Sequence, residues 1–137
     1  MAPLPYQKFQ PFVAAWGAGV HDFANDQLAV AFLDTVPLGT ESLLADLSEV
    51  PYTYATSRDL TTVSFDTTAG VLALVVDDLT VGSNGGDLGP WQAIAIYNAT
   101  AAGSPLVCFF DYGEAITQHD GDAVDLIFDV SGLFDLT

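Results

Sequence analysis

The segment from Trp91 to Asp129 constrains the fold more than any other part of the chain, because it predicts three successive β-strands. The first two, WQAIAIYN and PLVCFFDYG, carry apolar side chains on both faces. A strand of this kind must be covered on both sides, as in the middle of a sandwich or barrel. The third strand, AVDLIFDV, alternates apolar residues with aspartates, which indicates one face in water. Its apolar positions are Val124, Leu126, Phe128 and Val130, and its aspartates are Asp125 and Asp129.

The rest of the chain supplies further strands and little helix. Apolar runs predict strands over 27–33, 60–65 and 70–76, with a turn at 66–69. A short helix is expected from Pro11, ended by Gly17 and Gly19, and residues 41–50 allow a second. The Gly- and Asp-rich stretch 77–90 is expected to be a loop. We therefore predict an all-β fold: an antiparallel β-sandwich or jelly-roll-like domain, with one or two short helices in the N-terminal third.

The length of 137 residues favours one domain. Residues 1–11, MAPLPYQKFQP, contain three prolines and no periodic pattern. Pro-rich segments favour extended backbone. We expect residues 1–11 to form an extended N-terminal arm and residues 12–137 to form a single β-sandwich domain.

The charge of the chain excludes several classes of partner. It has 18 acidic residues against two basic ones, Lys8 and Arg58, and a net charge of −16. Binding to nucleic acid requires Lys and Arg to displace counterions, so neither nucleic acid nor an anionic membrane is expected as a direct partner. No apolar run approaches the ~20 residues of a membrane span, and no N-terminal signal pattern is present, so synthesis in a cytoplasm is expected. An acidic surface suits a basic protein partner or cations.

No catalytic motif stands out, and we expect neither an enzyme nor a resident cofactor or metal. The single Cys108 lies in an apolar strand, which indicates a core residue. His21, with Asp22 and Asp26 nearby, could be a metal ligand, but a surface or capping role is favoured. The second histidine, His119, precedes Asp120-Gly121, a hairpin signal that explains the polar residues there without a cation. The glycine-rich stretch 77–90 lacks the spacing of a phosphate-binding or calcium loop.

Several segments together resemble a family of small tailed-bacteriophage virion structural proteins. The resemblance spans nearly the whole chain in order and is clearest in the C-terminal half. The matching pieces are Tyr6-Gln7-Lys8-Phe9 with Phe12, Gly19-Val20-His21, Leu28-Ala29-Val30-Ala31, Ala45-Asp46-Leu47-Ser48-Glu49, Gly89-Pro90-Trp91, Ile94-Ala95-Ile96-Tyr97-Asn98, Pro105-Leu106-Val107, Asp111-Tyr112-Gly113 with Ile116-Thr117, and Asp120-Gly121-Asp122.

The resemblance implies a β-rich capsid decoration or cement protein without catalytic residues. Its implied partner is the major capsid protein of the same virion, which it binds as a homo-oligomer, a dimer or trimer, on the capsid surface after synthesis in the host bacterial cytoplasm. The chain departs from the family at 51–59, PYTYATSRD, where relatives carry a glycine-rich loop. Contacts made by that loop are therefore not carried over.

Two sets of residues are candidates for the partner interface. We expect the arm to supply one set and the aromatic residues of the 51–59 loop a second. The candidates are Pro3, Leu4, Pro5, Tyr6 and Phe9, and then Tyr52 and Tyr54. Two other functions stay open: a tail, fibre or head–tail joining protein, and a carbohydrate-binding sandwich in which Trp91, Tyr52 or Tyr54 stacks on a sugar. For Trp91 a core position is favoured, because it opens an apolar strand.

Overall fold

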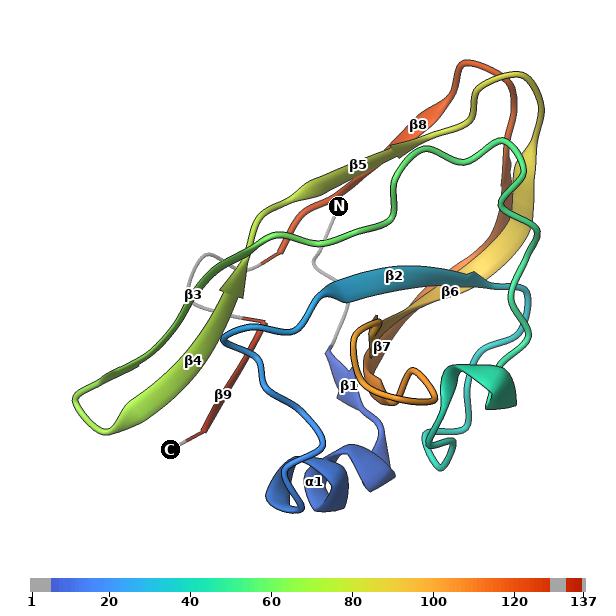
Figure 1. The fold of residues 1–137 in the computed structure, drawn as a ribbon. Helices are drawn as coiled ribbons and strands as arrows, with labels where there is room; N and C mark the ends of the chain where they lie inside the picture. The colour runs from blue at the N-terminus through green and yellow to red at the C-terminus, as the bar shows by residue number, and fades with distance from the viewer. Residues whose placement is uncertain (1–5, 129–132, 137) are drawn as a thin grey trace.

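The structure, a computed structural model, describes residues 6–128 and 133–136. Its paired strands are antiparallel, and its one α-helix lies near the N-terminus, which confirms the predicted all-β fold (Figure 1). The elements are β1 (Gln7–Lys8), α1 (Gln10–Gly17), β2 (Leu28–Leu33), the 3-10 helix η1 (Leu44–Asp46), β3 (Thr62–Thr68), β4 (Val71–Val76), β5 (Leu79–Gly82), β6 (Leu88–Asn98), β7 (Leu106–Gln118), β8 (Ala123–Leu126) and β9 (Phe134–Leu136).

A single bent ribbon of two antiparallel chain segments forms the frame of the molecule. Strands β4, β5 and β6 follow one another along the chain, and their partners β9, β8 and β7 follow one another in the opposite direction. The chain reverses only once within this ribbon, between β6 and β7. Figure 1 shows the ribbon running from the β6–β7 end, around the corner at upper right, back along β5 and β8 towards β4 and β9.

The remaining strands extend the two ends of this ribbon. At one end β2 pairs with β6 and β1 pairs with β7, giving the order β1-β7-β6-β2. At the other end β3 pairs with β4, giving the order β3-β4-β9. The β3–β4 hairpin turns through Ala69 and Gly70, both at positive φ (52° and 83°). A two-residue turn with this backbone matches the twist of the strands that it joins.

The core lies where β2 and the end of β6 are buried on both faces. All of β2 and the last six residues of β6 are buried, as the doubly apolar pattern predicts. Trp91 is 2 % exposed and belongs to this core, which confirms the favoured interpretation of that residue. Beyond β8, Leu126 and Phe128 are buried whereas Ile127 is 77 % exposed. The predicted alternation therefore holds through Phe128, and its last two positions lie outside the described residues.

Three predicted loops or turns differ from the structure in their extent or in what they connect. The stretch 77–90 contains strand β5 and the start of β6, because Leu79 and Val81 alternate with polar residues between the glycines. Of the turn expected at 66–69, residues 66–68 are strand, and the chain reverses at Ala69 and Gly70. A turn does form at Asp120-Gly121, where the Asp122 N–H donates to the His119 carbonyl at 2.8 Å. It does not close a β7–β8 hairpin, because β8 pairs with β5.

The described part of the N-terminal arm belongs to the domain and does not extend from it. Strand β1 pairs with β7, and the Phe9 N–H donates to the Val107 carbonyl at 3.2 Å. Helix α1 begins at Gln10, with a proline in its first turn, so the boundary expected between residues 11 and 12 falls inside a helix. Pairing with β7 satisfies backbone hydrogen-bonding groups of this segment, and the Phe9 side chain packs in the core. None of the helices in 6–128 or 133–136 is long and apolar enough to cross a membrane.

Candidate functional site

The expected interface residues of the N-terminal arm occupy different environments. Tyr6 is 36 % exposed, and its ring stands edge-on to Phe110 at 6.1 Å between centroids. Burial raises the pKa of the Tyr6 hydroxyl, which therefore stays protonated and can donate a hydrogen bond. Phe9 is fully buried, with its ring 4.9 Å from that of Phe109, and is a core residue with no free surface for a partner. The other candidates of this set, Pro3, Leu4 and Pro5, lie outside the described residues.

Tyr52 is half-buried and holds the loop 48–60 against the edge of β2. Its hydroxyl donates to Glu49 Oε1 at 2.7 Å and accepts from the Phe32 N–H at 2.9 Å. The Arg58 guanidinium lies 3.5 Å from the ring centroid and donates to the Val30 carbonyl at 2.7 Å. Burial, followed by the hydrogen bond to Glu49, raises the Tyr52 pKa. One ring face is thus occupied by a cation, and a sugar cannot stack there.

Tyr54 has the most exposed side chain among the four expected interface residues that the structure describes. It is 43 % exposed, and its ring lies against the backbone of Gly85 and Gly86. A Cβ built on Gly86 would lie 2.4 Å from the ring, so only glycine allows this close approach. The Asn84 N–H donates to the Tyr54 carbonyl at 2.8 Å and fixes the loop beside the ring. Gly85 and Gly86 thus form a glycine ledge against which the Tyr54 ring lies.

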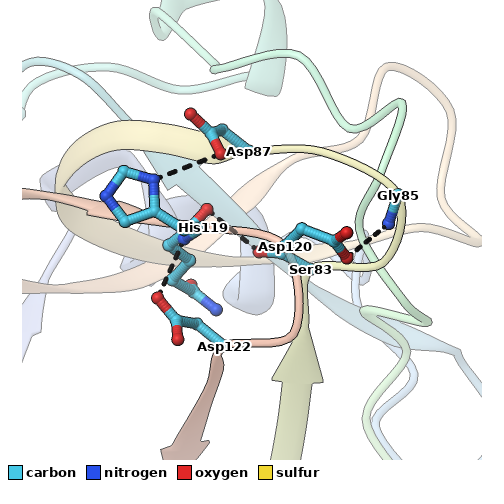
Figure 2. A network of polar contacts seen from close by, with 7 residues as sticks. Ser83, Gly85, Asp87, His119, Asp120 and Asp122 are labelled. Atoms are coloured by element: carbon cyan, nitrogen blue, oxygen red, sulfur yellow. Dashed lines mark hydrogen bonds and ion pairs between the residues drawn. The ribbon is translucent and has the colours of Figure 1, made fainter.

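Beside this ledge, the bend of the ribbon carries a polar network that Figure 2 shows from close by. Asp120 accepts from the Gly85 N–H at 2.8 Å, and Asp122 accepts from the His119 N–H at 2.9 Å. The His119 ring lies 3.2 Å from Asp87, and both side chains are more than half exposed. Asp120 and Asp122 therefore fix the backbone of the two loops, whereas Asp87 contacts only a side chain. Among the described residues no group of His, Cys, Asp or Glu side chains is arranged to hold a metal ion.

Underneath the network, buried polar side chains join β5, β6 and β7 at the bend. Gln118 is 4 % exposed; its Oε1 accepts from Trp91 Nε1 at 3.1 Å, and its Nε2 donates to the Val81 carbonyl at 3.1 Å. Ser83 Oγ donates to the Gln118 carbonyl at 3.3 Å. Sequence reasoning missed this group, because Gln118 lies within 114–122, a segment interpreted as following the strand, whereas β7 continues to Gln118. The Trp91 indole N–H was the available signal, because an indole N–H in an apolar strand needs a buried hydrogen-bond acceptor.

His21 is 6 % exposed, which contradicts the expected surface or capping role. Its ring stacks on Phe23 at 5.0 Å, and Nδ1 lies 3.0 Å from Asn98 Nδ2. Asp26 accepts from the same Asn98 amide at 2.7 Å. Burial lowers the His21 pKa, and the charge of Asp26 opposes this shift. The ring is therefore a neutral hydrogen-bond acceptor inside the fold.

The acidic residues and the two cations together define the chemistry of the surface. None of the acidic side chains in residues 6–128 is buried. Of the two basic residues in the sequence, Arg58 is half-buried on Tyr52, which leaves Lys8 exposed on β1. Burial raises the pKa of the Cys108 thiol, so this side chain is not a nucleophile near neutral pH. The surface is suited to binding a basic partner.

Comparison of the chain with protein-family models, with curated protein sequences and with solved structures found no match.

Proposed function

We propose that the chain is a structural protein of a tailed-bacteriophage virion, a capsid decoration or cement protein that binds the major capsid protein lattice. The observation that carries the proposal is the surface charge. The chain has a net charge of −16, the acidic side chains in residues 6–128 are all at least partly exposed, and Arg58 is held within the fold. An acidic surface steers a protein towards basic patches on a partner and keeps free copies apart.

The bent ribbon supports this proposal mechanically. Two chain segments run together over six strands, with a buried hydrogen-bond group at Gln118 to brace the bend. A protein that reinforces a shell needs a stiff body and contact surfaces on neighbouring subunits, and no reaction centre. The family resemblance of Gly89-Pro90-Trp91 and Asp111-Tyr112-Gly113 points to the same role.

Quantitative mass spectrometry of purified virions tests the proposal, by counting copies of this chain relative to the major capsid protein. A ratio near one, or a simple fraction of one, is expected for a protein on the shell lattice. A few copies per particle would instead support a tail, fibre or head–tail joining role. Absence from purified particles would overturn the virion proposal altogether.

A carbohydrate-binding function is the second candidate, and the environment of Tyr54 favours it. Among the three aromatic residues first considered, Trp91 is buried and Tyr52 lies under Arg58, whereas Tyr54 is 43 % exposed on the glycine ledge. Sugars stack on such rings and hydrogen-bond to nearby carboxylates, and Asp120 is adjacent through Gly85. A glycan array probed with the native chain and with Tyr54→Ala tests this function. Binding that is absent, or unchanged by the substitution, would remove it.

A further inference from the structure

Strand β3 lies at the edge of its sheet. It pairs with β4 on one side, and no other strand in the described part of the chain pairs with its second side. The β3–β4 hairpin projects away from the β1-β7-β6-β2 sheet, and β3 follows its outer margin (Figure 1). An edge strand of seven residues presents unpaired backbone N–H and C=O groups, which form a template for another strand.

The hairpin turn determines which of these groups point outward. Because the turn has two residues, Thr68 and Val71 form the hydrogen-bonded pair that closes it. Hydrogen-bonded and non-bonded pairs alternate along an antiparallel ladder, so Asp66 also bonds to β4. The backbone groups of Phe65 and Thr67 therefore point to the free edge. Val63, the extra residue of a bulge, lies outside this alternation.

Charge makes this edge approachable for another acidic molecule. Residues 61–76 contain one charged residue, Asp66, although the chain carries 18 acidic residues in total. The exposed side chains around it are threonines and Val63, which is 57 % exposed. Strands rich in β-branched residues pair well. At about 0.15 M salt the Debye length is about 8 Å, so acidic groups farther than this from β3 are largely screened.

We propose that β3 is the contact strand of a two-fold dimer, in which the β3 strands of two copies pair antiparallel with Phe65 opposite Phe65. This register brings the outward groups of the two Phe65 residues together and overlaps all seven residues of each strand. It also places Ser64 opposite Asp66 of the second copy, so that a hydroxyl faces a carboxylate. Pairing Phe65 with Thr67 instead would place the two Asp66 side chains opposite each other, which like charges disfavour. The inference does not rest on the proposed function.

Analytical ultracentrifugation of the full chain at low and high salt tests the dimer. An edge contact of this size is small, so we expect a weak monomer–dimer equilibrium that strengthens as salt screens the acidic surfaces. Ser64→Asp sets two like-charge pairs across the contact, and we expect it to weaken dimerisation by roughly tenfold. The control Thr53→Asp adds the same charge on an exposed loop and leaves the dimer unchanged.

Two further variants keep the test decisive if Ser64→Asp perturbs the fold. Thr67→Pro removes an outward N–H, a change that edge strands tolerate, and it is expected to abolish dimerisation while circular dichroism stays native. Adding Asp66→Lys to Ser64→Asp sets opposite charges across the contact and is expected to restore the dimer. A chain that stays monomeric at high salt overturns the proposal, and so does a dimer that neither Thr67→Pro nor Ser64→Asp weakens.

Discussion

The side-chain amide of Asn98 fixes the tautomer of His21. The Asn98 oxygen accepts from the N–H groups of Thr100 and Ala101, at 3.0 and 3.1 Å, so the amide nitrogen must face the other way. That nitrogen donates one hydrogen to Asp26 and the other to His21 Nδ1. The neutral ring therefore carries its proton on Nε2, which is buried without a partner among the described residues. Protonation of Nδ1 would set a donor against a donor.

Stability is expected to fall as the pH drops from 7.5 to 5.5. Burial holds the folded pKa of His21 below its ordinary value of 6.5, so the unfolded chain binds the proton more readily. The stabilising contribution of the neutral ring is therefore complete above pH 6.5 and is lost as the pH falls towards the folded pKa. Urea midpoints at the two pH values measure this effect.

The comparison variant for that experiment is His119→Gln, which removes the exposed histidine at the bend. His21→Phe keeps an aromatic ring beside Phe12 and Phe23 but has no group that titrates. It should lower the stability at pH 7.5, since Asn98 loses an acceptor, and flatten the dependence above pH 5.5. An unaltered slope in His21→Phe would rule out this residue as the origin.

Gln118→Leu is expected to destabilise the fold by about 2–3 kcal/mol, because it leaves two buried polar groups without a hydrogen-bond partner. The Trp91 indole N–H and the Val81 carbonyl both lose their partner in this variant. Gln92→Leu is the control: Gln92 donates to the Asp34 carbonyl near solvent, and water can replace that bond. If chemical denaturation shows that the two variants lose the same free energy of unfolding, burial of these hydrogen bonds at the bend contributes nothing to stability.

The sequence predicts the class of fold because strand periodicity survives into the structure. Leu126 and Phe128 are buried and Ile127 is exposed, as alternation requires. The local sequence of a strand does not identify the strand with which it pairs. Asp120-Gly121 makes a turn, yet β8 pairs with β5, a choice decided by the 79–82 segment far away in sequence. Turn chemistry is local, whereas pairing depends on contacts across the whole ribbon.

The environments of the candidate interface residues likewise depend on long-range packing that the local sequence does not show. An aromatic residue in a Pro-rich segment reads as free surface, but Phe9 is buried because β1 pairs with β7. Tyr52 and Tyr54 look alike in the sequence, two residues apart. They differ because Arg58 covers one ring whereas Gly85 and Gly86 support the other. Long-range packing separates these residues, and no local pattern encodes it.

Gly86→Ala is expected to displace the Tyr54 ring and to destabilise the chain by roughly 1–3 kcal/mol, because the added Cβ overlaps the ring. Gly17→Ala is the matched control, since a Cβ there meets nothing within 4 Å. In a Tyr54→Ala background the cost of Gly86→Ala should largely vanish. Thermal denaturation of the four variants measures this coupling, and an undiminished cost in that background would mean that the ring does not rest on Gly86.

Deleting residues 2–9 would confuse binding with folding, because it removes Phe9 from the core. Phe9→Ala alone is expected to cost about 3–5 kcal/mol of stability, as for other buried aromatics. Tyr6→Ala and deletion of residues 2–5 leave Phe9 and β1 in place. If the arm contacts the capsid, these two variants lower the number of copies per virion while their melting temperatures stay near that of the native chain. Capsid occupancy that is unchanged in both would remove the arm from the interface, and Lys8→Ala on β1 would then be the next surface variant to measure.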